Sequence, residues 1–122
     1  MISINETKEI HTLLIEIFGG SHGIRDNDAL ESALARPFQT YASVELYKGI
    51  LQKAAALIES ILINHPFIDG NKRVGYVLLR MFLVRNGLEI KATQDEKYEF
   101  VISIATGELK FEGIVQWLEN HI

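Results

Sequence analysis

The chain of 122 residues contains no cysteine. This absence excludes a disulfide framework, a thiolate metal site and a cysteine nucleophile, and it fits a reducing compartment. Long apolar runs are also missing, because Arg80 interrupts the most apolar window, residues 74–84, whereas a membrane-spanning helix needs about 20 apolar residues. The first residues lack the charged start and apolar stretch of a secretory leader. We therefore expect a cytoplasmic protein that does not enter a membrane.

Positive charge is scarce as well. The 12 Lys and Arg residues stand against 16 Asp and Glu residues, so the formal net charge is −4. General nucleic-acid binders are usually basic, so we expect no direct nucleic-acid partner. Any anion site must then be a local feature of the surface. Internal repeats and linkers are absent, and the length suits a single domain over residues 1–122.

Apolar and polar residues almost nowhere alternate as in a strand, whereas apolar residues recur at helical spacing along most of the chain. Capping residues, glycines and prolines mark the ends of these periodic segments. We expect a loop or irregular flap between Arg36 and Tyr47, and a brief extended segment at residues 88–92. The predicted helices cover residues 6–18, 28–35, 46–64, 71–85, 94–105 and 112–120. The predicted fold class is therefore all-α, a compact bundle of about six helices.

Two of the predicted helices meet at the segment His65-Pro-Phe-Ile-Asp-Gly-Asn-Lys-Arg73. The second helix begins inside this segment, and a helix N-terminus offers unpaired N–H groups and partial positive charge to a phosphate. Gly70 lets the backbone turn tightly and approach a ligand. Asn71, Lys72 and Arg73 add an amide and two cations, although cations at this end oppose the helix dipole. A bound anion would explain this cluster.

A carboxylate and an imidazole complete the segment. Asp69 precedes the cluster, and a single carboxylate beside phosphates is a typical ligand of Mg²⁺. His65 lies at the other end, and an imidazole, with an unperturbed pKa of about 6.5, can accept a proton at neutral pH. One loop thus supplies a base, a metal ligand and a phosphate site. Phosphoryl or nucleotidyl transfer from ATP to a hydroxyl requires these three parts.

Each of these residues also has a structural interpretation. His65 can be a helix C-terminal residue whose positive charge suits the dipole. Asp69 can cap the following helix, a role that is compatible with metal binding. Lys72 can be an ordinary solvated lysine, and Arg73 can pair with a surface carboxylate. For Tyr41 and its neighbours, a target-docking flap and an ordinary surface loop are both open interpretations. No metal-ligand spacing, and therefore no chemistry, is assigned to His11, His22 or His121.

The string His-Pro-Phe-x-Asp-Gly-Asn-x-Arg closely resembles the signature of the Fic/Doc (Fido) family. Further short segments occur in the order expected for the death-on-curing (Doc) toxin branch of that family. They are residues 23–26, 30–37, 45–47, 53–56, 82–87 and 117–118. The resemblance therefore extends over most of the chain and implies the helical Fido fold.

The resemblance also implies a role for the residues of the motif. His65 would be the general base that takes the proton from the target hydroxyl, and Asp69 would bind Mg²⁺. Phe67 would point into the core and fix the loop. The phosphates would be held by Gly70, Asn71 and Arg73. These roles agree with the chemistry of the same side chains.

Lys72 and Gly70 resemble different branches of the family. Members that transfer AMP usually have glycine at the position of Lys72. Lysine there resembles the Doc toxin, a kinase that phosphorylates a threonine of elongation factor Tu and stops translation. Doc has alanine at the position of Gly70, so the motif is intermediate between the branches.

The motif therefore leaves three functions open for the chain. The leading hypothesis is the toxin of a toxin–antitoxin pair, which uses ATP and Mg²⁺ to phosphorylate a translation factor, elongation factor Tu. The alternatives are a protein adenylyltransferase and a non-catalytic phosphate-binding module. Many Fic enzymes carry an inhibitory helix with the string Ser/Thr-x-x-x-Glu-Gly/Asn. This string is absent here, so we expect inhibition by a separate antitoxin chain.

Overall fold

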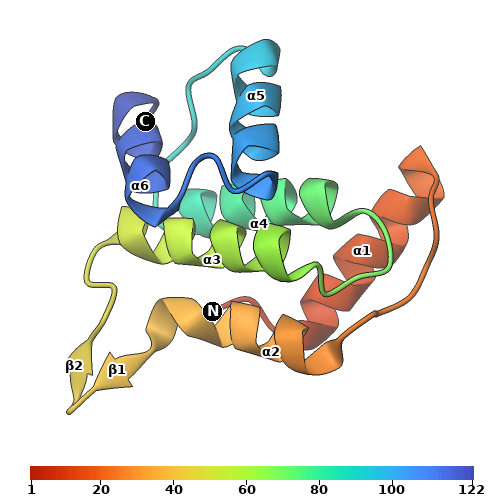
Figure 1. The fold of residues 1–122 in the computed structure, drawn as a ribbon, viewed down its shortest axis with the longest axis horizontal. Helices are drawn as coiled ribbons and strands as arrows, with labels where there is room; N and C mark the ends of the chain where they lie inside the picture. Colours follow the sequence, from red (N-terminus) through yellow and green to blue (C-terminus); the bar gives the residue numbers. More distant parts are fainter.

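The computed structural model describes residues 1–122 as six α-helices and one short β-hairpin (Figure 1). The predicted all-α class is thereby confirmed. The helices are α1 (Ile4–Phe18), α2 (Asn27–Ala35), α3 (Ile50–Asn64), α4 (Asn71–Arg85), α5 (Gln94–Ala105) and α6 (Phe111–Asn120). A short 3-10 turn, η1 (Arg36–Phe38), precedes strands β1 (Thr40–Tyr41) and β2 (Val44–Glu45). None of the helices combines the length and the apolar character needed to span a bilayer.

Helix α3 lies at the centre of the molecule. It packs against α4, α2, α5 and α6, with α1 and α2 on one side of the α3–α4 pair and α5 and α6 on the other (Figure 1). A helix surrounded in this way must be apolar around most of its circumference, and residues 53–58 of α3 are all buried. A single cluster of 21 buried apolar residues fills the space between the helices. The fold thus has one core, organised around α3.

Helices α3 and α4 form an antiparallel pair that packs tightly at Gly75, in the second turn of α4 (Figure 1). A Cβ atom at Gly75 would lie 2.9 Å from Leu62 Cδ2 and 3.4 Å from Ile61 Cγ2. Only glycine allows this separation without displacing a buried leucine. Gly75 therefore serves close packing of the two helices. As a result, the C-terminus of α3 and the N-terminus of α4 lie side by side, with the motif loop between them.

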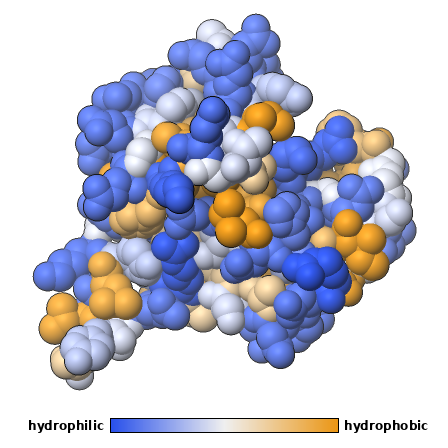
Figure 2. All heavy atoms as spheres, viewed as in Figure 1, coloured by the Kyte–Doolittle hydropathy of each residue, from blue (hydrophilic) through white to orange (hydrophobic).

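The predicted flap contains a hairpin, in which Thr40 pairs with Glu45 and Tyr41 pairs with Val44. Its two turn residues, 42 and 43, both have positive φ, which suits the twist of a two-residue hairpin turn. The tip is exposed, and Figure 2 shows apolar side chains on this lower-left projection. The hairpin lies at the N-terminal end of α3, whereas the motif loop lies at its C-terminal end (Figure 1).

One boundary of the predicted elements needs correction. Helix α3 begins at Ile50 rather than at residue 46. The buried Lys53 binds the carbonyl oxygen of Tyr47 and, at 3.1 Å, the carboxylate of Glu45, so the chain before α3 is held in the hairpin connection. Residues 88–92 form no strand. They pass close to the C-terminus, where the Lys91 N–H donates to the carbonyl oxygen of His121 at 2.5 Å.

Candidate active site

The motif loop begins and ends with a residue in the left-handed region. His65, which follows α3, has φ 49° and ψ 60°, and Pro66 disfavours the helical conformation for the residue before it. Gly70, which precedes α4, has φ 78°. A positive φ is ordinary for glycine but uncommon for histidine. The loop therefore ends α3 sharply and places the His65 side chain at the surface.

The imidazole of His65 is oriented by a backbone carbonyl group in the last turn of α3. Its Nδ1 atom lies 3.0 Å from the carbonyl oxygen of Ile63. A carbonyl oxygen can only accept, so Nδ1 carries the proton and, in the neutral ring, Nε2 has a free lone pair. The ring is exposed, and Nε2 makes no hydrogen bond within the protein. This tautomer is the one that a general base acting through Nε2 requires.

The carboxylate of Asp69 is held by two backbone N–H groups. Oδ2 accepts from Ser21 at 3.1 Å, and Oδ1 accepts from Gly70 at 2.8 Å. These two bonds, that from Ser21 first, hold the pKa of Asp69 below its ordinary value, and the charges of His11 and Arg73 act in the same direction. The side chain is therefore an oriented anion at neutral pH, exposed at the mouth of the loop.

This donor set fits one kind of metal site. No group of three or more His, Asp or Glu side chains could enclose a metal ion. A single ionised carboxylate at the start of a helix suits Mg²⁺, because this ion keeps several waters and takes its remaining ligands from bound phosphates. Asp69 is thus suited to hold Mg²⁺ jointly with a nucleotide, and not to hold a metal by itself.

The first turn of α4 offers positive charge next to Asp69. The N–H groups of Asn71, Lys72 and Arg73 have no acceptor within the helix. The Lys72 and Arg73 side chains are exposed, and the Arg73 guanidinium lies 4.4 Å from the centroid of the Phe18 ring. Phe18 thereby holds this cation beside the helix start. The three N–H groups and two cations together favour an anion at this position.

The side chain of Asn71 has a different position from its neighbours. It is buried, and its amide group is fully engaged with the loop. The Phe67 N–H donates to Oδ1, and Nδ2 donates to the Phe67 carbonyl oxygen, both at 3.0 Å. The expected position of Phe67 in the core is confirmed, because its ring is 1% exposed. Asn71 therefore offers a phosphate its backbone N–H, while its side chain fixes the loop.

A second segment, residues 20–26, runs beside the motif loop and supports it. Ile24 and Phe67 form an antiparallel bridge. The Arg25 side chain donates to the carbonyl oxygens of His65, at 2.7 Å, and Asn64. Backbone bonds on either side complete the pairing: Ile68 N–H to Gly23, and Arg25 and Asp26 N–H to Pro66. The only sequence signal for this role is that residues 23–26 resemble the Doc branch.

His11 supports the loop from the opposite side. Its ring is 3% exposed and stacks on the Phe67 ring, with centroids 4.0 Å apart and an interplanar angle of 7°. Its Nε2 atom lies 2.8 Å from the carbonyl oxygen of Asp69. The spacing of the histidines gave no indication of this contact, which joins α1 to the centre of the motif.

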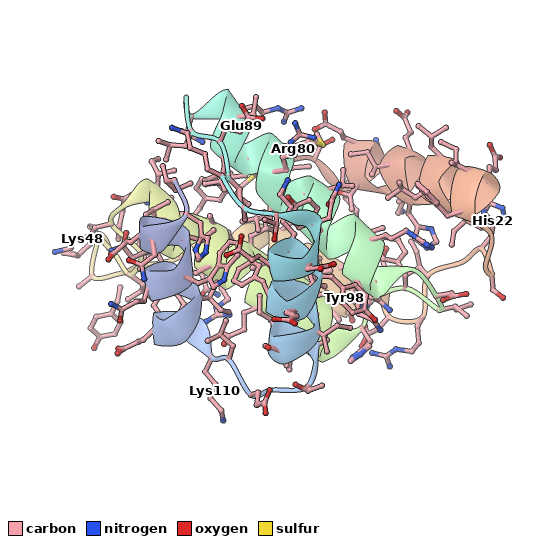
Figure 3. All side chains as sticks on the ribbon, turned by 90° about the horizontal axis from the view of Figure 1, so that it is seen from above. His22, Lys48, Arg80, Glu89, Tyr98 and Lys110 are labelled. Atoms are coloured by element: carbon pink, nitrogen blue, oxygen red, sulfur yellow. The ribbon has the colours of Figure 1, made fainter.

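A groove of about 790 Å³ extends from the motif loop along α4 to α5. This volume is in the range of small-molecule sites. His65, Asp69 and the start of α4 form its charged end. Its other side is formed by α5, from which Tyr98 projects (Figure 3). Away from the loop the lining is mainly apolar and aromatic, with the polar Gln94 and Lys97 of α5 beside Tyr76, Val77, Tyr98, Val101 and Ile102. A nucleotide with its phosphates at the loop and its base against α5 would match this distribution.

Fold and site together define a class: a helical domain with a cationic helix start, a free imidazole and one oriented carboxylate. Residues 1–83 match the model of the Fic/DOC family, and the chain belongs to this family. It is 35% identical over 99 residues to a protein named Toxin Doc from Mycolicibacterium smegmatis, covering 80% of this chain and 76% of that protein. It is 26% identical over 119 residues to Protein kinase doc of Escherichia phage P1, covering 98% and 93% respectively.

Proposed function

We propose that the chain is the toxin of a toxin–antitoxin pair, a cytoplasmic protein kinase that transfers the γ-phosphoryl group of ATP to a hydroxyl of a translation factor, elongation factor Tu. The observation that carries this proposal is the unbonded Nε2 of His65 at the same end of one groove as the cationic start of α4. The similarity to proteins named Toxin Doc and Protein kinase doc supports it.

In the proposed reaction the target hydroxyl approaches the γ-phosphorus of ATP in line with the oxygen that bridges the β- and γ-phosphorus atoms. His65 Nε2 accepts the hydroxyl proton as the new oxygen–phosphorus bond forms, and the bond to the bridging oxygen breaks to release ADP. The free N–H groups of α4, with Lys72 and Arg73, stabilise the negative charge on the transferred group. Mg²⁺ held by Asp69 would neutralise charge on the phosphates.

The choice between phosphoryl and nucleotidyl transfer depends on which phosphorus lies beside His65. Lys72 is the second residue of α4 and is exposed at the phosphate end of the groove. A cation there attracts the terminal phosphate, which carries the most charge, whereas glycine would leave space for a chain of phosphates along the helix start. Lys72 therefore favours the γ-phosphorus. Gly70 favours the alternative, an adenylyltransferase, because it resembles the AMP-transferring branch.

Labelled ATP separates the three candidate functions. A kinase marks purified elongation factor Tu with γ-labelled ATP and not with α-labelled ATP. The reverse pattern would identify the adenylyltransferase, and ATP binding with no label on any protein of a host extract would identify the non-catalytic module. The matched variant is Lys72→Gly, which should weaken γ-label transfer and increase any α-label transfer. An unchanged pattern in this variant would show that Lys72 does not select the phosphate.

A separate antitoxin is the proposed partner, since the chain lacks the inhibitory string of many Fic enzymes and its groove is open. A disordered segment that folds on this surface could supply the inhibition. Expression of the chain alone should arrest growth, and co-expression of the neighbouring gene should relieve the arrest. The control is a His65→Asn variant expressed at the same level, which should be harmless. Growth arrest by that variant would point to a cause other than transfer.

A further inference from the structure

The peptide group that joins Asp69 to Gly70 is held at both ends. Its carbonyl oxygen lies 2.8 Å from Nε2 of His11, and its N–H donates to Oδ1 of Asp69 at 2.8 Å. Since a carbonyl oxygen only accepts, the Nε2 atom of His11 is the protonated nitrogen of that ring. One histidine on α1 and one carboxylate on the loop thus determine which way this peptide faces.

Without such a restraint, this peptide would be free to turn over. Gly70 adopts φ 78°, and glycine populates negative φ about as readily. Rotation of the peptide by about half a turn would exchange the positions of its C=O and N–H. The carbonyl oxygen would then face the carboxylate of Asp69, which would lose a donor and be repelled from its present position. The hydrogen bond from His11 opposes this exchange.

The position of the His11 ring is fixed by the residues around it. It is buried on α1, and its ring lies flat against Phe67, which Asn71 anchors in turn. No carboxylate pairs with His11, and its Nε2 contact is with the motif loop alone. A buried ring with one polar contact, directed at the peptide next to the metal-binding candidate, has a more specific role than filling the core.

We propose that His11 is a positioning residue, which orients the Asp69–Gly70 peptide so that the Asp69 carboxylate can bind Mg²⁺ together with the phosphates of ATP. The inference rests on the proposed function in one respect, the role of Asp69 as a ligand of Mg²⁺. Groups that orient a metal ligand in this way typically contribute about 10- to 100-fold to metal affinity. His11 would act through the peptide, without touching either the metal or the substrate.

Three substitutions separate the hydrogen bond of His11 from its aromatic ring. His11→Phe keeps a ring against Phe67 and loses the donor. His11→Gln loses the ring, but its amide nitrogen is as many bonds from Cα as Nε2 and can donate to the same carbonyl oxygen. His11→Met has a similar length and neither feature. If the proposal is correct, Mg²⁺ affinity is kept in the variant that retains a hydrogen-bond donor, His11→Gln. If His11 has a purely structural role, all properties are instead kept in the variant that retains a ring, His11→Phe.

The measurement is the affinity of each variant for a non-hydrolysable ATP analogue, taken by calorimetry once with Mg²⁺ and once with EDTA. The ratio of the two affinities should fall about 10- to 100-fold in His11→Phe and His11→Met, and should stay close to the unmodified value in His11→Gln. The Gly70 amide resonance should shift in the same two variants, because its N–H leaves the carboxylate. Urea unfolding records the loss of the ring separately.

Two results would overturn the proposal. In the first, the ratio of the affinities with Mg²⁺ and with EDTA is unchanged in His11→Phe; in the second, this ratio is as low in His11→Gln as in His11→Met. If His11→Phe does not fold, the Gln and Met pair still gives the answer. If the unmodified protein binds the analogue equally well with and without Mg²⁺, the metal-binding role of Asp69 is wrong. If only the positioning role is wrong, the result is different. Mg²⁺ then increases the affinity of the unmodified protein and of His11→Phe for the analogue by the same factor.

Discussion

Asn71 and Phe67 are joined by a closed pair of hydrogen bonds: the side-chain amide of Asn71 both accepts from the Phe67 N–H and donates to the Phe67 carbonyl oxygen, at 3.0 Å each. The first residue of α4 is thereby tied to the loop that leads into it. The shape of the loop and the start of the helix form one unit, and the free N–H groups of α4 keep a fixed position relative to His65.

Substitution of Asn71 by aspartate should destabilise the fold. The carboxylate keeps the acceptor but loses the donor, so two oxygen atoms face each other in a buried site, which costs about 1–3 kcal/mol or more for a charged group. A negative charge at a helix start recovers about 0.3–1 kcal/mol, which is too little to compensate. Urea unfolding at neutral pH measures the difference. The exposed neighbour provides the control, because Lys72→Gln should stay within about 0.5 kcal/mol.

Gly19 and Gly20 offer a matched pair for testing the position of Asp69. Both have positive φ, 86° and 115°, so alanine at either position should cost about 1–3 kcal/mol of backbone strain. Only at Gly20 would the new Cβ meet the carboxylate, 2.6 Å from Asp69 Oδ2, whereas a Cβ at Gly19 meets nothing within 4 Å. Gly20→Ala should therefore reduce transfer about 10- to 100-fold at limiting Mg²⁺, and Gly19→Ala should leave it nearly unchanged. Equal losses in the two variants would contradict the carboxylate's placement.

The depressed pKa of Asp69 predicts how stability depends on pH. A carboxyl whose pKa is lower in the folded than in the unfolded chain stabilises the fold above its unfolded pKa of about 3.9, and this contribution disappears as pH falls through the folded value. The N–H groups of Ser21 and Gly70 are the main cause of the lowered pKa. The free-energy difference between the unmodified protein and Asp69→Asn should therefore be constant from pH 5 to 7 and shrink below about pH 4. A difference that changes between pH 5 and 7 would show that another group is responsible.

Removal of the His65 imidazole should abolish transfer without unfolding the protein. His65→Asn is the sharpest variant, because asparagine tolerates the left-handed backbone of this position and its Nδ2 can donate to the Ile63 carbonyl oxygen in place of Nδ1. It lacks a base at the Nε2 position. Loss of a general base typically costs about 10²- to 10⁴-fold in rate. ATP-analogue affinity and unfolding should change little, whereas a variant with full transfer activity would exclude His65 as the base.

The helices could be predicted because their apolar residues repeat at helical spacing, and because capping side chains precede α1, α2 and α5 while Gly19 and Asn86 follow α1 and α4. The start of α3 could not, since it depends on Lys53 reaching back to the chain around Tyr47, and the apolar Leu46 continues the helical pattern past the true boundary. The hairpin consists of two exposed pairs, which is too short for strand alternation to be visible in the sequence.

The motif loop was visible in the sequence because its residues are contiguous, but its supports were not. His11, Ser21 and Arg25 bond to residues 58, 48 and 40 positions away, respectively. No local pattern records such contacts. Residue type also left the position of Asn71 open, because an amide can bond either a phosphate or a backbone peptide group. In the structure its side chain is buried beside Phe67 and bonds the backbone of that residue.

The long sequence separation of these supports affects how the site arises during folding. Closing loops of this length carries an entropic cost, which must be met before the contacts form. The α3–α4 hairpin contains the whole motif, yet without α1 and residues 20–26 the Asp69 carboxylate keeps only its bond from the Gly70 N–H, and the end of α3 loses its bonds from Arg25. A partly folded chain would therefore display the motif without a working site. Binding competence should be acquired in one cooperative step, when α1 and residues 20–26 dock against residues 64–69.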